Sequence, residues 1–218
     1  MRKVTNNYYL SVEGETEKWY FNHLQNLINN SDKASHKVIF NIKISKSITK
    51  YAKSTTVIYP SKFFHICDYE SNDESHRIQF DNILNELRNV KKINRNINYK
   101  LGYNNFSFEL WIILHKGKCA KHFSHRRQYL EKINEFYGEN FESLTSYKEE
   151  RNFNKILNQI TLDDVIQAVK NGKEIRDINI KDSSQNYRKN GNFEYYTENP
   201  DMTIYECVGQ VLSECGLL

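Results

Sequence analysis

The chain has 218 residues and a formal net charge of +4, with 39% hydrophobic and 27% charged residues. This length fits one medium domain, or a compact core with a smaller elaboration. No apolar run approaches the roughly 20 residues that cross a bilayer, and the N-terminus lacks the apolar segment of a secretory signal. We therefore expect a soluble cytoplasmic protein that does not contact a membrane.

The cysteines do not form a pattern typical of a disulfide framework or a zinc site. Cys67, Cys119, Cys207 and Cys215 are scattered, with no Cys-x-x-Cys pair, so we expect reduced thiols. Cys119 lies near His122 and His125, but that spacing matches no common zinc finger. A phosphate-binding glycine-rich loop is also missing, which disfavours ATP binding by this chain.

Residues 7–17 predict a strand that ends at a tight turn and is followed by a helix. Residues 8–12 are mostly aromatic and aliphatic, as in buried strands, and Gly14 supplies the flexible backbone of the turn. Thr16 is a candidate helix cap, and apolar residues recur beyond it at helical spacing, at Tyr20, Leu24, Leu27 and Ile28. Glu13 is then displayed at the C-terminal end of a strand, where open α/β sheets place ligand sites.

The pattern of strand and helix alternates up to about residue 105 and is mostly helical after it. We expect strands at 37–45, 63–67 and 97–101, helices at 76–92 and 203–215, and a buried helix at 106–115. Residues 47–61 predict a short helix or a crossover loop, 102–105 a turn, and 172–200 a mobile loop or insertion. The order favours an α/β core over residues 1–120 and a mainly helical extension over 121–218, packed as one unit.

Acidic side chains follow two of the predicted strands. Glu13 and Glu15 follow the first, and Asp68, Glu70 and Asp73 follow the strand at 63–67. If these carboxylates converge at one sheet edge, a cation must offset their repulsion, and hard oxygen ligands suit Mg²⁺ or Mn²⁺. The alternative is that they are helix N-terminal residues and solvated turns.

Three stretches carry basic residues and no acid, over residues 33–62, 88–100 and 116–127. Such runs can neutralise the phosphates of DNA or RNA, although many basic runs are only solvated surface. Acidic clusters beside basic runs are what a metal-dependent enzyme needs if it acts on a polyanion. The candidate nucleic-acid-binding residues are Lys116, Lys118, Lys121, Arg126 and Arg127.

Four segments together resemble the RloB-like family, also called the abortive-infection AbiL second-component type. They are Val-Glu-Gly-Glu-Thr-Glu at 12–17, Cys-Asp-Tyr-Glu at 67–70, Phe-Glu-Leu-Trp-Ile-Ile-Leu-His at 108–115 and Asn-Pro-Asp-Met-Thr-Ile-Tyr at 199–205. The resemblance spans nearly the whole chain. It implies a Toprim-like α/β fold, with a mostly parallel sheet flanked by helices, and an antiphage setting, often beside a separate AAA-type ATPase.

The resemblance also implies roles for particular residues. Glu13 takes the place of the Toprim glutamate in acid/base or metal chemistry, and Asp68 and Glu70 take the place of the Asp-x-Asp pair that binds Mg²⁺. Because the second member here is glutamate, Asp73 is a candidate to replace or supplement it. Glu109 is a further candidate, with the alternative that it is a satisfied buried carboxylate. His115 is the last candidate, and the alternative is that it is a structural cation at a helix C-terminus.

Taken together, the sequence predicts a Mg²⁺- or Mn²⁺-dependent phosphodiesterase, a nuclease effector of abortive infection whose catalytic residues are drawn from Glu13, Asp68, Glu109 and His115. The competing prediction is a non-catalytic nucleic-acid-binding or regulatory subunit of an ATPase-containing defence complex. The sequence does not distinguish DNA from RNA substrates. A homodimer is plausible only as the commonest oligomer of soluble proteins.

Overall fold

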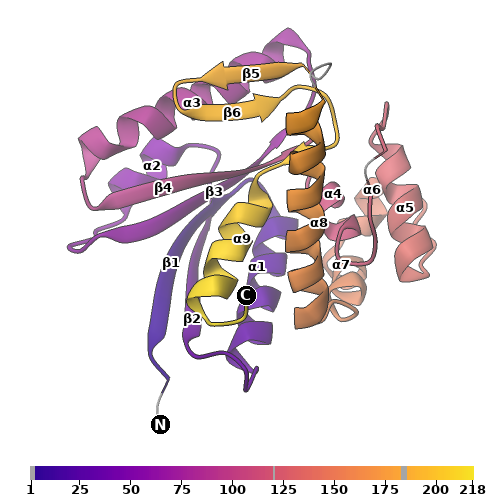
Figure 1. The fold of residues 1–218 in the computed structure, drawn as a ribbon, viewed down its shortest axis with the longest axis horizontal. Helices are drawn as coiled ribbons and strands as arrows, with labels where there is room; N and C mark the ends of the chain where they lie inside the picture. Colours follow the sequence, from indigo (N-terminus) through magenta and orange to yellow (C-terminus); the bar gives the residue numbers. More distant parts are fainter. Residues whose placement is uncertain (1–2, 120, 183–185) are drawn as a thin grey trace.

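A computed structural model describes residues 3–119, 121–182 and 186–218 (Figure 1). At its centre is a five-stranded sheet in the order β2-β1-β3-β4-β7, parallel except for β7, which is antiparallel to β4. A separate antiparallel hairpin joins β5 to β6. The strands are β1 (Thr5–Val12), β2 (Lys37–Ile44), β3 (Ser61–Tyr69), β4 (Ile97–Asn105), β5 (Tyr187–Asn190), β6 (Phe193–Tyr196) and β7 (Asp201–Met202).

Helices cover both faces of the sheet, which confirms the predicted α/β fold with a mostly parallel sheet and a helix at the C-terminus (Figure 1). The arrangement is consistent with a Toprim-like fold. None of the described helices is long and apolar enough to cross a bilayer. The helices are α1 (Glu15–Asn29), α2 (Ile48–Ser54), α3 (Glu74–Ile93), α4 (Glu109–Ile113), α5 (Arg127–Tyr137), α6 (Leu144–Tyr147), α7 (Glu150–Leu157), α8 (Leu162–Lys181) and α9 (Ile204–Glu214).

The largest core lies on the face of the sheet that α1, α4 and α9 cover. Alternate residues of β1 point into it, at Tyr8, Leu10 and Val12, together with Phe64 and Ile66 of β3. A second cluster on the other face packs α2 and α3 against Phe63 and Ile97. Because neighbouring strands β1, β3 and β4 are parallel, their C-terminal ends meet at one edge of the sheet.

Several local predictions were wrong. β4 continues through residues 102–105, where we expected a turn, and α4 is shorter than the predicted helix at 106–115. The N-cap of α1 is Gly14; Thr16 lies inside the helix and donates a hydrogen bond from Oγ1 to Glu17 Oε2 at 3.1 Å. The four cysteines are buried and unpaired, which confirms the expected reduced thiols.

Residues 172–200 were predicted as a mobile loop or insertion, and the described part of this segment instead contains regular secondary structure. Helix α8 continues to Lys181 and the β5–β6 hairpin follows. Helix α9 approaches α8 so closely at Gly172 that an added Cβ would lie 2.9 Å from Cβ of Tyr205. The polar composition of this segment therefore reflects a helix that buries several polar residues in specific contacts. Hydrophobic periodicity alone does not reveal such contacts.

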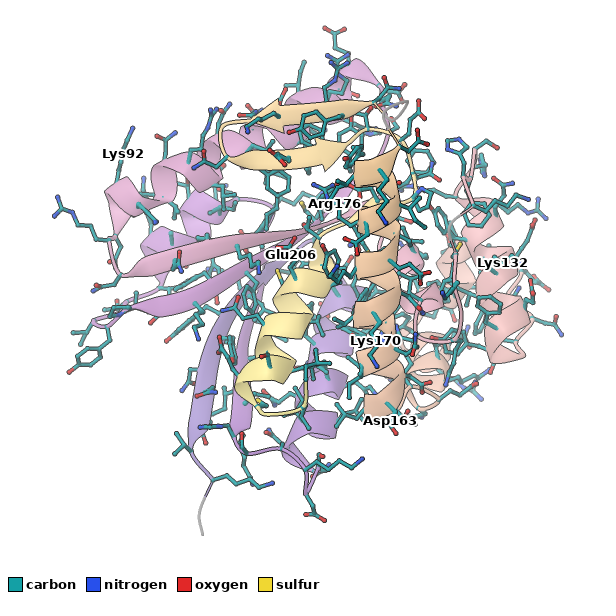
Figure 2. The ribbon with its side chains drawn as sticks, viewed as in Figure 1. Lys92, Lys132, Asp163, Lys170, Arg176 and Glu206 are labelled. Carbon is teal, nitrogen blue, oxygen red and sulfur yellow. The ribbon has the colours of Figure 1, made fainter. Side chains whose placement is uncertain are left out.

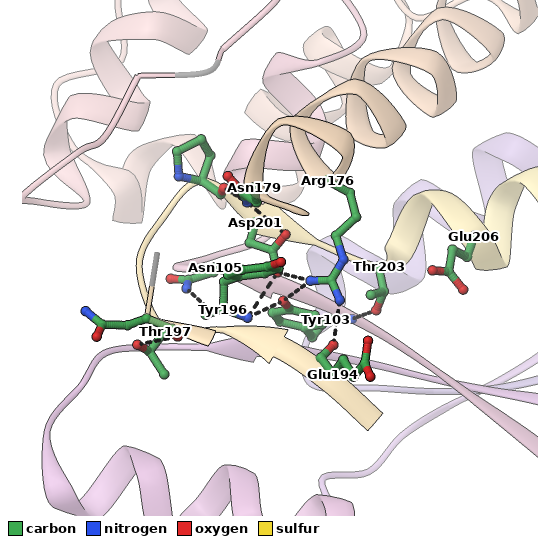
Figure 3. A network of polar contacts seen from close by, with 12 residues as sticks. Tyr103, Asn105, Arg176, Asn179, Glu194, Tyr196, Thr197, Asp201, Thr203 and Glu206 are labelled. Carbon is green, nitrogen blue, oxygen red and sulfur yellow. Dashed lines mark hydrogen bonds and ion pairs between the residues drawn. The ribbon is translucent and has the colours of Figure 1, made fainter. Parts of the chain in front are cut away.

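A buried ion pair holds α8, β7 and the hairpin together (Figure 3). Arg176 Nη1 lies 2.7 Å from Oδ2 of Asp201, which is fully buried. Asn179 donates to Asp201 Oδ1 at 3.1 Å, and Arg176 also donates to the carbonyl of Glu194 at 2.8 Å. The backbone N–H of Tyr196 donates to Asp201 Oδ2 at 3.3 Å. Since one carboxylate ties three elements together, the Asn-Pro-Asp-Met-Thr segment has a structural role in fixing the end of β4.

Candidate active site

A pocket of about 270 Å³ opens at the C-terminal edge of the parallel strands. Its acidic side combines the turn between β1 and α1 with the end of β3. Its basic side comes from three separate parts of the chain. The lining residues are Glu13, Gly14, Glu15, Thr16, Glu17, Lys46, Asp68, Glu70, Arg126 and Lys148.

Glu13 reaches from the end of β1 across to β3. Its Oε2 accepts a hydrogen bond from the backbone N–H of Asp68 at 3.0 Å. A side chain in place of Gly14 would put a Cβ 3.1 Å from Glu17 Oε2, so glycine lets the first turn of α1 approach the strand end closely. The turn therefore brings two glutamates to the end of β3.

The carboxylate of Asp68 has no hydrogen-bond or ion-pair partner among the described residues. Burial raises its pKa well above the usual value, and three neighbouring carboxylates raise it further, those of Glu13, Glu17 and Glu109; Lys148 partly offsets this. Burial also raises the pKa of Glu13, and its hydrogen bond from Asp68 and the charge of Lys46 oppose that rise. Two adjacent carboxyls with raised pKa values indicate a site that gains from a bound cation.

Glu109 is tied to the pocket through Lys148. Its side chain is 3% exposed, and its Oε1 lies 2.9 Å from Nζ of Lys148. Burial alone would raise the pKa of Glu109, but the charge of Lys148 and the hydrogen bonds to the carboxylate together outweigh burial, and the pKa is lowered. Glu109 is therefore a satisfied buried carboxylate, and it holds a lysine ammonium at the pocket.

Three charged residues of the pocket, Glu17, Lys46 and Lys148, were not among the predicted site residues or acidic clusters. Glu17 is only 7% exposed, and burial raises the pKa of its carboxyl. A signal for it was present in the sequence, because Glu17 is in phase with the buried residues Phe21, Leu24 and Ile28 of α1. Lys46 lies in the basic stretch at 33–62, but nothing in the sequence singles it out there, and Lys148 gave no signal at all, since only the fold brings the two lysines to the pocket.

Glu70 lines the pocket but contacts two basic side chains. Its Oε2 lies 3.2 Å from Nε2 of His76 and 3.5 Å from Nη2 of Arg126. Asp73 is exposed, lies outside the pocket lining and accepts a hydrogen bond from Ser71 Oγ at 2.9 Å. The structure thus brings Glu13, Asp68 and Glu70 together and leaves Asp73 outside.

The predicted nucleic-acid-binding residues differ in their contacts. Lys116 pairs with Asp164 at 2.8 Å and Lys118 pairs with Glu174 at 2.6 Å, whereas Arg126 lines the pocket. Lys121 and Arg127 are exposed. Lys92 on α3 and Lys132 on α5 lie at opposite ends of the molecule (Figure 2). Arg126 is therefore the member of the predicted set that can neutralise a phosphate bound in the pocket.

His115 is 2% exposed and lies in the core rather than in the pocket lining. Its Nδ1–H donates to the carbonyl of Trp111 at 2.9 Å, so its Nε2 accepts from the hydroxyl of Tyr20, 3.1 Å away. Burial lowers the pKa of His115 to about 4, and the hydrogen bond to Trp111 only partly opposes this. The side chain is a neutral packing residue, and the alternative of a cation at a helix end is wrong.

His115 predicts a pH dependence of stability. Its pKa in the unfolded chain is near 6.5 and falls to about 4 on folding, so the unfolded state binds the extra proton between these values. The contribution of neutral His115 to the free energy of unfolding is greatest well above pH 6.5. It decreases by about 3 kcal/mol as the pH falls to 4. Urea unfolding of wild type and His115→Gln across this range should show the stability difference shrink with acid. A difference that is constant with pH would contradict the neutral buried histidine.

The donor set of the pocket fits a hard divalent cation. The described residues contain no group of three or more His, Cys, Asp or Glu side chains placed to hold a metal ion, which also leaves the Cys119 region without a zinc site. Magnesium, however, is commonly bound through one or two carboxylates together with waters and substrate phosphates. Glu13 and the unpartnered Asp68 supply such a pair.

A family model described as RloB-like protein matches residues 8–210. The matched range includes both strand ends that form the pocket and the Asn-Pro-Asp-Met-Thr segment. No curated protein and no solved structure matches the chain. The family match confirms the resemblance expected from the four sequence segments.

Proposed function

The chain belongs to the RloB-like family, and on that premise we propose that it is a metal-dependent nucleic-acid phosphodiesterase, a nuclease effector of prokaryotic antiphage defence. The observation that carries the proposal is the Asp68 carboxylate, which is half-buried beside the carboxylates of Glu13, Glu17 and Glu109 and has no hydrogen-bond or ion-pair partner among the described residues. Lys46, Arg126 and Lys148 line the same pocket. A cation beside these acids and a phosphate beside these bases would satisfy both sets of charges.

The residues of the pocket suggest a division of roles. Asp68 would hold the cation with Glu13 beside it, and a bound divalent cation acidifies water and offsets phosphate charge. Oε2 of Glu13 is engaged by the Asp68 N–H, so Oε1 is available to accept a proton from an attacking water. Burial raises the pKa of Glu13, which makes its carboxylate a stronger base. Lys148 and Arg126 neutralise charge on the scissile phosphate.

Cleavage of nucleic acid tests this proposal. Purified protein is incubated with plasmid DNA, single-stranded DNA and total RNA, each with Mg²⁺, Mn²⁺ or EDTA. We expect metal-dependent products from at least one substrate, lost by about 100-fold or more in Asp68→Asn. Asp73→Asn is the matched control, because Asp73 lies outside the pocket, and it should cleave as wild type does. Products that persist in Asp68→Asn would refute the role of this pocket in cleavage.

One observation favours a second function, a non-catalytic nucleic-acid-binding or regulatory subunit that acts with a separate AAA-type ATPase. Glu70, the counterpart of the second Toprim aspartate, is engaged by His76 and Arg126. Intact nucleic acid under all conditions, with binding still seen by mobility shift, would support this function. If cleavage appears only when the ATPase is added, the nuclease function is supported instead, with the ATPase as a required partner.

A further inference from the structure

Asn104 lies beside Asp68 at the C-terminal end of the neighbouring strand. β3 and β4 are parallel, with Asp68 in register with Asn104. Side chains in register on parallel neighbours leave the sheet on the same face. On this face Gly102 of β4 packs against Ile66 of β3 and Ile204 of α9. The Asn104 carboxamide therefore enters the same layer as the Asp68 carboxylate.

The carboxamide of Asn104 is buried without partners. The residue is 0% exposed, and neither its Oδ1 nor its Nδ2 has a hydrogen-bond partner among the described residues. Leaving a buried amide unsatisfied is costly, so such groups in folded proteins are normally met by protein, water or a bound ligand. An apolar residue at this position would avoid the cost, and the amide thus indicates an occupant next to Asp68.

A cation at Asp68 is the occupant whose chemistry fits both residues. The carboxylate of Glu13 already reaches over β3 to the backbone of Asp68, and Asn104 is in register with Asp68 on the next strand, although it does not itself line the pocket. Asparagine carbonyl oxygens are hard ligands of the kind that Mg²⁺ and Mn²⁺ accept. A site with Asn104 has a third protein oxygen donor beside the two carboxylates.

We propose that Asn104 Oδ1 is the inner ligand of the cation bound at Asp68. This inference rests on the proposed metal-dependent function and adds a ligand that neither the acidic motifs nor the family resemblance assigned. The ligand explains why a polar residue occupies a fully buried position at the end of β4. It also places one side of the cation deep in the protein, away from the nucleic acid.

Calorimetric titration of metal-free protein with Mn²⁺ tests the ligand directly. Asn104→Leu should weaken Mn²⁺ binding by about 10-fold or more, whereas Asn104→Asp, which keeps an oxygen at the same place, should retain it. Without metal, Asn104→Leu should melt no lower than wild type, because the substitution removes an unsatisfied amide. Circular dichroism before each titration confirms that the variants are folded.

The outcomes separate this inference from the proposed function. If Asn104→Leu binds Mn²⁺ as tightly as wild type does, Asn104 is not a ligand. That result would leave the proposed metal site at Glu13 and Asp68 intact. Equal weakening in Asn104→Leu and Asn104→Asp would also overturn it, since the position would then matter only through packing. If wild type itself does not bind Mn²⁺ and does not cleave nucleic acid, the proposed function fails, and this inference fails with it.

Discussion

Asp68→Asn should make the metal-free protein more stable than wild type, by about 1–2 kcal/mol at pH 7–8. Desolvation of the half-buried Asp68 and the charges of three neighbouring carboxylates raise its pKa in the folded chain. An amide of nearly the same shape removes that repulsion. Urea unfolding at several pH values measures the difference.

The gain in Asp68→Asn should depend on pH with a definite sign. A carboxyl whose pKa is raised on folding destabilises the fold above that pKa and has no effect below its unfolded value, here near 3.8. The advantage of the variant should therefore shrink as the pH falls through the raised pKa and vanish in strong acid. Asp73→Asn, which changes an exposed carboxyl outside the pocket, is the control substitution.

Divalent cations should reverse the order of stability. Mn²⁺ at 100 times its dissociation constant stabilises a folded protein by about 2.7 kcal/mol, and wild type should gain this while Asp68→Asn gains much less. Thermal melts with Mn²⁺ or EDTA measure both. A metal-free Asp68→Asn that is less stable than wild type would show that Asp68 serves the fold and not a cation.

Lys148→Met has the second large expected effect, because the substitution removes the cation from two partners. It leaves the buried carboxylate of Glu109 unpaired, which should cost about 2 kcal/mol of stability. It also removes a positive charge from the pocket and should slow cleavage by about 100-fold. Lys132→Met is the matched control, since Lys132 pairs with Glu135 on the exposed surface of α5.

A second substitution separates the two effects of Lys148. In Lys148→Met combined with Glu109→Gln, the buried charge is gone and stability should return to within about 1 kcal/mol of wild type. Cleavage should stay low, because the pocket still lacks the ammonium group. Recovery of cleavage together with stability would mean that Lys148 only neutralises Glu109 and has no part in phosphate chemistry.

The structural features that were predicted correctly are those that depend on short stretches of sequence. The strand over residues 8–12 and the helix after it follow from local periodicity, and Glu13 follows from its place at the strand end. Asp68 was found in the same way after a second apolar run. Parallel topology then brings both together at one edge, a consequence of the alternation of strands and helices.

The features that were missed depend on contacts between distant segments. Lys148 lies on the loop after α6 and reaches the pocket only because α4 places Glu109 there. Helix α8 was not expected beyond residue 172, because its polar composition there is typical of a loop. Those polar residues are stabilised by distant partners such as Asp201, which the local sequence does not reveal. Asn104 lay in a predicted turn, and only the register of β4 against β3 places it beside Asp68.

Anomalous diffraction from a crystal grown with Mn²⁺ tests the central claim most directly, that this pocket is a cation site. We expect one strong manganese peak with oxygens of Glu13, Asp68 and Asn104 at roughly 2.0–2.4 Å, and no peak in crystals of Asp68→Asn. Wild-type crystals without a peak at these side chains, under conditions in which the protein is folded and the pocket is open to solvent, would contradict the claim.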